Sequence, residues 1–401
     1  MHNFSSRWLC LITLFLAVSL WSGCTDEATR HLSDANQAFQ TGDYEKAKAE
    51  YMNVLHTDPY NSTAVIRLGQ IWQEQGAPWR AGLFLKKGVE IAPNDADNRL
   101  RLARVYQELG GPAEARSQVQ TILRQSPGNG DALLLLAELA RTPDEIAEAE
   151  RAMEKFPQKE NASYQLARAN IALHKKDLAT AQDAVATAIV LAPMSPDAYE
   201  LRAVIQRFRK DPQAAEKAYG AAGVLAPPRS PFHIRYATFL EETAGPAAAA
   251  AYLQKVTGKA PDFLPAWVML AKIAFNQSNY EQAMTYLKKV FSYDSENINA
   301  HLIESDIRLA QHQPAQVITE LEQIDQAHPG LASVKYRLAT AYLQENKTDV
   351  AIKTLEAILK KQPDFKPARD RLADAYRAAG RAADAANLSR QQPVATPEST
   401  P

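Results

Sequence analysis

The sequence predicts an all-α fold, a solenoid of about ten helix–turn–helix repeats with a capping helix or partial repeat at its C-terminal end. Three observations lead to this prediction: a period of 34 residues, apolar residues at helical spacing, and small residues at fixed places in each period. The residues that close successive repeats are Pro59, Pro93, Pro127, Pro157, Pro193, Pro227, Pro261, Ser295, Pro329 and Pro363. A fixed period of this length is typical of a repeat architecture.

Residues 62–93 illustrate one repeat. Val65, Leu68 and Ile71 recur at helical spacing. The residues at 76–78 interrupt this pattern, and a second helix follows. Pro93 ends that helix, because proline cannot continue a helix without losing a hydrogen bond. Each repeat is therefore predicted to be two short antiparallel helices, and the abundance of alanine also favours helices.

Small residues stand where the two helices of a repeat are expected to touch. Those of the first helices are Ala35, Gly69, Ala103, Ala137, Ala169, Ala203, Ala237, Ala271, Ser305, Ala339 and Ala373. Those of the second helices are Ala47, Ala81, Ala115, Ala181, Ala215, Ala249, Ala283, Ala351 and Ala385, with Val317 in one place. Helices approach closely only where the side chains at the contact are small. Successive repeats are thus expected to nest, since no helix pair can bury its apolar face alone.

This pattern resembles the tetratricopeptide repeat, whose signature includes the small residues of both helices, aromatic residues and the closing proline. The segments GDYEKA at 42–47 and NYEQA at 279–283 are similar to its turn between helices. The resemblance covers about residues 28–390. It implies a right-handed superhelix whose first helices line a concave face, where partners bind as peptides or helices. The last unit, from Phe365 to Arg390, is expected to be a polar cap.

One repeat is shorter than the others. The chain from Ala137 to Pro157 lacks four residues relative to the chain from Gly69 to Pro93. Four residues are close to one helical turn, so the apolar stripe can stay in phase. Two interpretations stay open: a bend or docking notch with a function, or a tolerated deletion.

The N-terminal segment differs from the repeats. An apolar run from Trp8 to Trp21 follows Arg7, and it is too short to cross a bilayer, which takes about 20 residues. Such a run is typical of a secretory signal. Gly23 and Cys24 come next, and this end resembles the lipobox of bacterial lipoproteins. The resemblance implies cleavage between Gly23 and Cys24 and acylation of Cys24, so we expect a signal peptide at 1–23 and a tether at 24–30.

Two other interpretations of this segment stay open, a non-lipidated signal and an uncleaved anchor. Trp21 stands where lipoproteins usually have leucine, valine or isoleucine. The only other cysteine, Cys10, lies in the segment that would be removed, so no disulfide is expected. Thr25 after the cysteine favours the periplasmic face of the outer membrane over the inner membrane, although Asp26 weakens that inference. Residues 31–390 are predicted to form the solenoid, and the proline-rich residues 391–401 a disordered tail.

The sequence contains no sign of catalysis. The metalloprotease, P-loop and nucleophile-elbow motifs are absent from it. His301 and His312 are the nearest plausible histidine pair, and both are expected to be surface or packing residues, so no metal or cofactor is predicted. The formal net charge of −1, without a long basic run, argues against binding nucleic acid on a broad basic face.

The candidate binding residues lie on the first helices. An apolar series precedes each small residue by three positions, as at Leu134 and Leu302, and a polar series follows each small residue directly. The two series suit a groove for an amphipathic helix, or else the apolar series is half-buried between helices. The candidates for groove binding are Arg104, Asn170, Arg207, Lys272, Phe275, Asp306, Tyr336 and Asp374.

The leading functional hypothesis is a non-enzymatic, lipid-anchored scaffold of the bacterial envelope that binds other proteins in assembling a secretion, pilus or exopolysaccharide system. The alternative is a groove that binds glycan or peptidoglycan fragments, for which aromatic residues such as Phe275 and Tyr336 are few. An enzyme hidden in the repeats is the third hypothesis.

Overall fold

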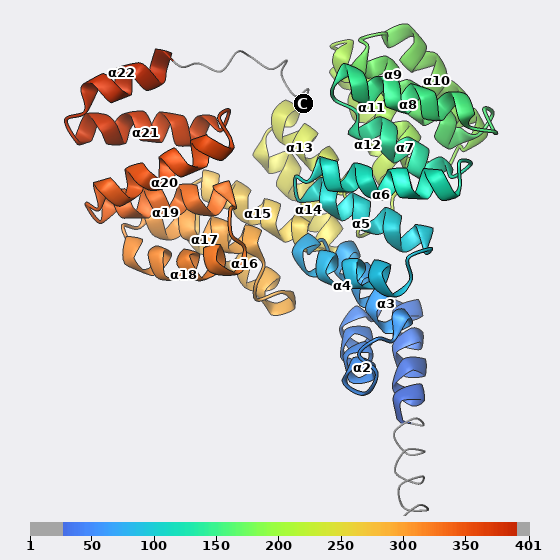
Figure 1. The fold of residues 1–401 in the computed structure, drawn as a ribbon, viewed down its shortest axis with the longest axis horizontal. Helices are drawn as coiled ribbons and strands as arrows, with labels where there is room; N and C mark the ends of the chain where they lie inside the picture. Colours follow the sequence, from blue (N-terminus) through green and yellow to red (C-terminus); the bar gives the residue numbers. More distant parts are fainter. Residues whose placement is uncertain (1–26, 391–401) are drawn as a thin grey trace, which may run out of the picture. The chain divides into compact units, whose positions relative to one another are not determined.

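The computed structural model describes residues 27–390, and these are helical apart from short connections. The signal peptide, Cys24 and the C-terminal tail lie outside the described residues. The first helices of the repeats are residues 27–41, α3 (Ser62–Glu74), α5 (Ala96–Glu108), α7 (Gly130–Leu139), α9 (Ala162–His174), α11 (Pro196–Phe208), α13 (Phe232–Ala244), α15 (Leu264–Asn276), α17 (Ile298–Ala310), α19 (Ala332–Gln344) and α21 (Lys366–Ala378). Figure 1 shows helices following one another as antiparallel pairs.

The second helices end where the sequence predicts. They are α2 (Tyr44–Thr57), α4 (Pro78–Ile91), α6 (Pro112–Gln125), α8 (Pro143–Lys155), α10 (Leu178–Leu191), α12 (Pro212–Leu225), α14 (Pro246–Lys259), α16 (Tyr280–Tyr293), α18 (Pro314–Ala327), α20 (Thr348–Lys361) and α22 (Ala382–Arg390). From α2 to α20, each stops two residues before its closing proline or Ser295. The residue before a proline avoids the helical region, so the chain leaves the helix at that point. The all-α repeat prediction is confirmed, including the partial repeat formed by α21 and α22.

The small residues lie at the contacts between helices. Apart from Ala373 and Ala385, the alanines of both series have no exposed surface, and Ser305 and Val317 are equally buried. At Gly69 an added Cβ atom would lie 2.7 Å from the Leu85 side chain, so α3 and α4 approach too closely for a larger residue. The predicted nesting is therefore confirmed.

A residue with positive φ joins the two helices of most repeats. It lies seven positions after the small residue of the first helix, and the set is Gly42, Gly76, Gly110, Lys176, Lys210, Ser278, His312, Asn346 and Gly380. Glycine adopts this conformation without steric cost, whereas an L-residue pays about 1 kcal/mol.

This cost leads to a stability prediction. Lys210 is exposed and has φ of 60°. Replacing Lys210 by glycine should raise the free energy of unfolding by about 0.5 kcal/mol, because the relieved strain exceeds the added freedom of the unfolded chain. Chemical denaturation checks this, with Lys217→Gly in the middle of α12 as the control. That change should destabilise by up to about 1 kcal/mol.

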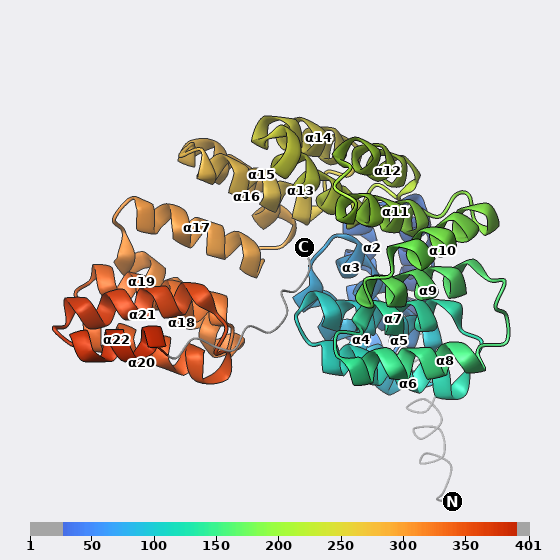
Figure 2. The same cartoon turned by 90° about the horizontal axis from the view of Figure 1, so that it is seen from above.

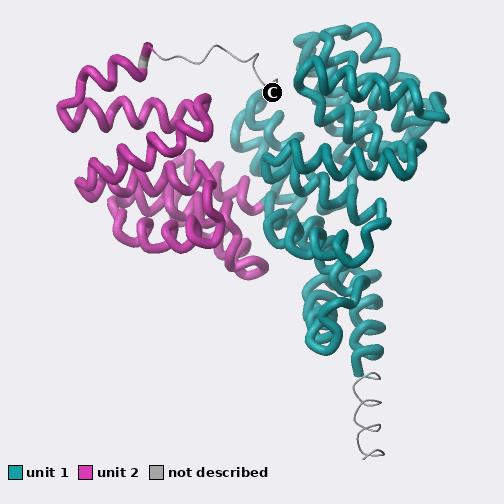
Figure 3. Tube along the Cα trace, viewed as in Figure 1, with its two compact units in different colours: residues 1–266 teal, residues 267–401 magenta. Residues whose placement is uncertain are grey.

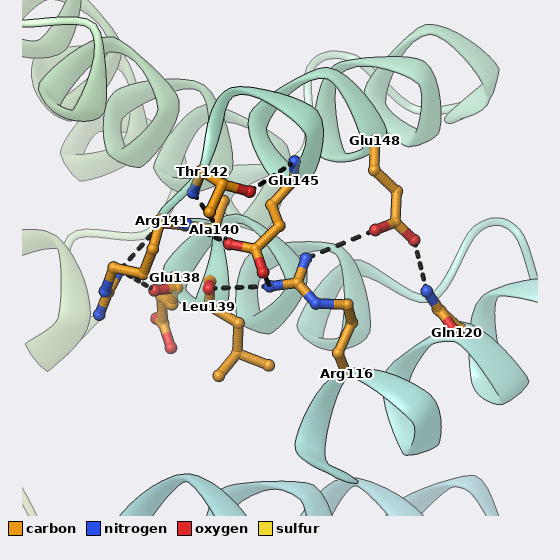
Figure 4. Close-up of polar contacts among 9 residues, drawn as sticks. All are labelled: Arg116, Gln120, Glu138, Leu139, Ala140, Arg141, Thr142, Glu145 and Glu148. Carbon is orange, nitrogen blue, oxygen red and sulfur yellow. Dashed lines mark hydrogen bonds and ion pairs between the residues drawn. The ribbon is translucent and has the colours of Figure 1, made fainter. Parts of the chain in front are cut away.

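The shortened repeat replaces this turn with a different structure. Helix α7 has 10 residues where the other first helices have 13, and it ends in extended backbone at Ala140. Helix α8 then begins with a capping box between Thr142 and Glu145. The Glu145 carboxylate accepts from the backbone N–H groups of Arg141 (2.7 Å) and Thr142 (2.9 Å) (Figure 4). These bonds satisfy backbone donors that the lost turn would otherwise leave unpaired.

Arg116, on α6 of the preceding repeat, stabilises this shortened connection (Figure 4). Its guanidinium donates to the Leu139 carbonyl at 3.1 Å and pairs with Glu145 at 2.6 Å and Glu148 at 3.4 Å. The Gln120 amide donates to Glu148 at 2.6 Å. Only 12% of the Arg116 side chain is exposed. The deletion is thus compensated by specific polar contacts from the neighbouring repeat, whichever of the two interpretations holds.

The chain divides into two compact units, residues 1–266 and 267–401, which are described separately (Figures 2 and 3). In the first unit, segments far apart in sequence meet. The Leu264 N–H donates to the Gln75 carbonyl at 2.9 Å, and the Gln75 amide donates to Asp262 at 3.1 Å. An added Cβ atom at Gly76 would lie 2.3 Å from Pro265. The first unit therefore returns on itself, which a period of 34 residues does not predict.

A polar network reinforces this return contact. The Gln75 side chain is fully buried, and its oxygen accepts from the Lys48 ammonium at 3.1 Å. Asp262 also accepts from Arg229 at 2.8 Å. Buried polar groups are stable only when they are paired in this way. Within residues 27–390, no helix is both long enough and apolar enough to cross a bilayer.

Candidate functional site

Charged side chains from the first helices of four repeats act on one another in the first unit. We call this set the charged surface, and its members are Arg104 and Glu108 on α5, Glu138 on α7, Asp197 and Glu200 on α11, and Arg235 on α13. Arg104 lies 3.9 Å from Glu138, and Arg235 binds both carboxylate oxygens of Glu200. Four carboxylates therefore share two guanidinium groups.

Burial changes the ionisation of these carboxylates. It raises the pKa of Glu138 to about 7, and Arg104 offsets this only in part. Burial likewise raises the pKa of Glu108 to about 7 and raises the pKa values of Asp197 and Glu200. Glu138 keeps 25% of its side chain exposed, and Glu108 more. A carboxylate that still meets water while protein surrounds it fits the wall of a concave surface, where desolvation opposes charge.

These shifts predict a pH dependence. A carboxyl whose pKa is raised from 4.5 to about 7 holds its proton more tightly in the folded protein. Stability should therefore fall as the pH rises from about 5 to 8. The Glu138→Gln variant should be more stable than the wild type at pH 8 by about 1–2 kcal/mol, after allowance for water access. The difference should vanish near pH 4.5. Thermal unfolding across this pH range tests the prediction, and Glu154→Gln on the exposed face of α8 serves as the control.

The family model of the tetratricopeptide repeat matches residues 74–139, 245–307 and 308–370. These ranges fall on the helix pairs that carry the small residues and the closing prolines. The chain is a tetratricopeptide repeat protein. Proteins of this family generally bind other proteins, and the fold is generally non-enzymatic.

Several solved structures are similar to this tetratricopeptide repeat protein. Yeast Tom70 has 15% sequence identity and a TM-score of 0.49, over 92% of this chain and 91% of that chain. Cut9, in the APC/C hetero-tetramer Cut9–Hcn1, has 14% identity and a TM-score of 0.42, over 87% and 96%. The thermophilic protein TTC0263 of Thermus thermophilus has 19% identity and a TM-score of 0.38, over 45% and 98%. No curated protein matches the sequence.

The predicted groove residues of the first unit take part in contacts within the array. Arg104 belongs to the charged surface. Arg207 pairs with Glu242 of the next first helix at 2.9 Å. The Asn170 amide donates to the Leu166 carbonyl at 3.1 Å, within its own helix. Arg104 is thus the candidate that the structure brings together with other charged groups on several helices.

The candidates of the second unit also have partners for the most part. Asp306 accepts two bonds from Arg337, at 2.8 and 2.6 Å. Asp374 pairs with Arg377 on its own helix. Lys272 is exposed on α15. The two aromatic candidates pack against rings: Phe275 against Tyr280 and Tyr336 against Phe365.

The apolar series follows the second of the two open interpretations at three positions. Leu134, Leu166 and Leu302 are at least 92% buried. Leu134 and Leu166 pack with Ala188 and Ala198, so they join neighbouring helices. These side chains contribute to packing between helices.

Sequence analysis missed several functional candidates. Glu108, Asp197 and Arg235 lie outside the positions directly after the small residues, where the search was made. A search at other positions of the same helix face would have found them, because residues three and four apart are neighbours on a helix. Ala149 on α8 was missed as well. It is fully buried in the place of the second-helix alanines, shifted by the deletion that follows.

Proposed function

We propose that this protein is a non-catalytic scaffold of the bacterial envelope, which binds partner proteins on the charged surface of its first helices. A lipid on Cys24 would hold it at the membrane, with the periplasmic face of the outer membrane favoured. The partners would be components of an envelope assembly such as a secretion, pilus or exopolysaccharide system. The proposal for the anchor rests on the sequence around Cys24.

The observation that carries the binding proposal is the charge balance of the charged surface. Its four carboxylates are matched by Arg104 and Arg235 alone, and burial disfavours their ionised state. A partner that brings lysine or arginine side chains would offset this unfavourable term. Opposite charges across an interface also give specificity and speed association.

Affinity capture after cross-linking in intact envelopes tests this proposal. Glu108 is the best position for a charge reversal, because it is exposed and on the charged surface. The Glu108→Lys variant should recover at least tenfold less of the partner than the wild type. Glu154→Lys on α8, away from the first helices, should recover as much as the wild type. Equal recovery by both variants would contradict the proposed binding surface.

Metabolic labelling with a fatty acid tests the anchor separately. The wild type should incorporate the label and the Cys24→Ser variant should not. Equal labelling of both would contradict the lipoprotein proposal and leave the binding surface untouched.

Glycan binding remains the alternative function. Aromatic platforms would be expected for it, whereas Phe275 and Tyr336 are engaged with neighbouring rings. Retention of the protein on a polysaccharide column, together with no recovered protein partner, would favour this alternative.

A further inference from the structure

Three potential metal ligands meet within one repeat of the second unit. His301 and Glu304 lie on α17, and Glu320 lies on α18. One ligand atom of each residue lies within 4.8 Å of the others. A search for histidine pairs could not find this set, because it contains a single histidine and joins two helices.

The orientation of His301 leaves one ring nitrogen available. Nε2 lies 3.0 Å from the Ser295 carbonyl, so this nitrogen carries the hydrogen in the neutral ring. Nδ1 is buried and has no hydrogen-bond partner. The nearest carboxylate oxygen, of Glu304, is 3.7 Å away, which is too far for a hydrogen bond. A backbone carbonyl that fixes the second nitrogen is the usual arrangement around a metal-binding histidine. The ring also packs against Phe291, which limits its rotation.

The two carboxylates are held in a complementary way. Arg308 donates to one oxygen of Glu304 at 2.6 Å and to one oxygen of Glu320. The second oxygen of Glu320 is buried without a hydrogen-bond partner. Glu304 has only 10% of its side chain exposed. Arg308 therefore neutralises one of the two negative charges and leaves one oxygen of each carboxylate for another cation.

We propose that His301, Glu304 and Glu320 bind one divalent transition-metal ion, with Zn²⁺ as the best match, and so tie α17 to α18. This inference goes beyond the proposed function, since it concerns the stability of a repeat and not the partner. An imidazole with two carboxylates suits Zn²⁺, and Mg²⁺ and Ca²⁺ prefer sites made of oxygen alone.

The distances are compatible with such a site after small side-chain rotations. Zinc bonds of about 2.0–2.1 Å in a tetrahedral site place the ligand atoms about 3.3 Å apart. The distance of 3.7 Å from His301 to Glu304 is close to this value. Glu320 has an exposed fraction of 34%, so it has room to move toward the other two and to admit a water molecule as the fourth ligand.

A proton on Nδ1 of His301 is the competing occupant. The neighbouring Glu304 carboxylate raises the pKa of His301, although burial opposes this. A protonated ring would face Glu304 and Glu320 as a second positive charge beside Arg308. The experiment therefore has to separate a bound metal ion from a bound proton.

Calorimetric titration with Zn²⁺ at pH 7.5, on the full chain freed of metal by a chelator, makes this distinction. All samples carry Cys24→Ser, so that the thiol does not compete. The parent protein should bind one equivalent of Zn²⁺, and His301→Gln and Glu320→Gln should each bind at least tenfold more weakly. His56→Gln, an exposed histidine on α2, should bind like the parent. Co²⁺ should give a visible absorption band in the parent that both site variants lose.

Thermal unfolding gives an independent readout. Zn²⁺ should raise the Tm of the parent and of His56→Gln, and leave that of the site variants unchanged. Circular dichroism in the absence of metal confirms that each variant is folded, and Glu320→Gln serves if His301→Gln is not. Zn²⁺ binding that is unaffected by either site substitution, or no binding by the parent, would overturn the proposal in favour of a protonated His301.

Discussion

Replacing Arg116 by alanine should lower the free energy of unfolding of the first unit by about 3 kcal/mol. The guanidinium is 12% exposed and contacts Glu145, Glu148 and the Leu139 carbonyl. Removing one partner of a buried ion pair leaves the other charges uncompensated, which costs about 3–5 kcal/mol in dry sites. Because Glu145 is 29% exposed, the lower end of this range applies.

The measurement for Arg116 is urea denaturation followed by hydrogen exchange of α7 and α8. Arrays of repeats can unfold in steps, so the exchange data identify which repeats lose protection. The control is Arg124→Ala on the same helix, where the guanidinium is exposed and donates to Thr121. That change should cost no more than about 0.5 kcal/mol. A loss below about 1 kcal/mol for Arg116→Ala would mean that the shortened repeat is stable without this contact.

Replacing Ala249 by leucine should destabilise the first unit by about 3 kcal/mol. Ala249 lies on α14 with no exposed surface. Three additional carbon atoms have no space there, and overpacking of a tight contact typically costs about 1–3 kcal/mol or more. The substitution would also separate α13 from α14 and disturb the next repeat.

The control for this prediction is two residues away. Ala247 is exposed on the same helix, so Ala247→Leu should change stability by less than about 0.5 kcal/mol. Both variants are compared by thermal unfolding and by near-ultraviolet circular dichroism. Equal effects of the two substitutions would mean that the alanine positions do not determine how the helices pack.

The fold could be predicted because its determinants are local and periodic. A closing residue such as Pro93 acts on its own helix, and a small residue such as Ala203 acts on its direct neighbour. Both kinds of position recur every 34 residues, so the sequence repeats the same evidence many times. The left-handed residues were not predicted at Lys176 and Lys210, because lysine gives no sign of positive φ.

The candidate site could be predicted less well, because it depends on contacts across repeats. Arg104 was predicted from its position, whereas its relation to Glu200 and Arg235 depends on how far the array turns between α5 and α13. The contact of Gln75 with Asp262 depends on the same curvature. Small rotations accumulate along a solenoid, and no single residue encodes their sum.

The central claim is that protein partners bind the first-helix side of the array, at the charged surface. Site-specific photo-cross-linking in intact envelopes tests it most directly, with the reactive group at Thr238, an exposed position on α13 close to Arg235. A matched probe at Val224, which is 85% exposed on the second helix α12, reports on the other side. The account predicts a protein adduct at position 238 and none at position 224. An adduct at 224 alone, or none at either position, would contradict it.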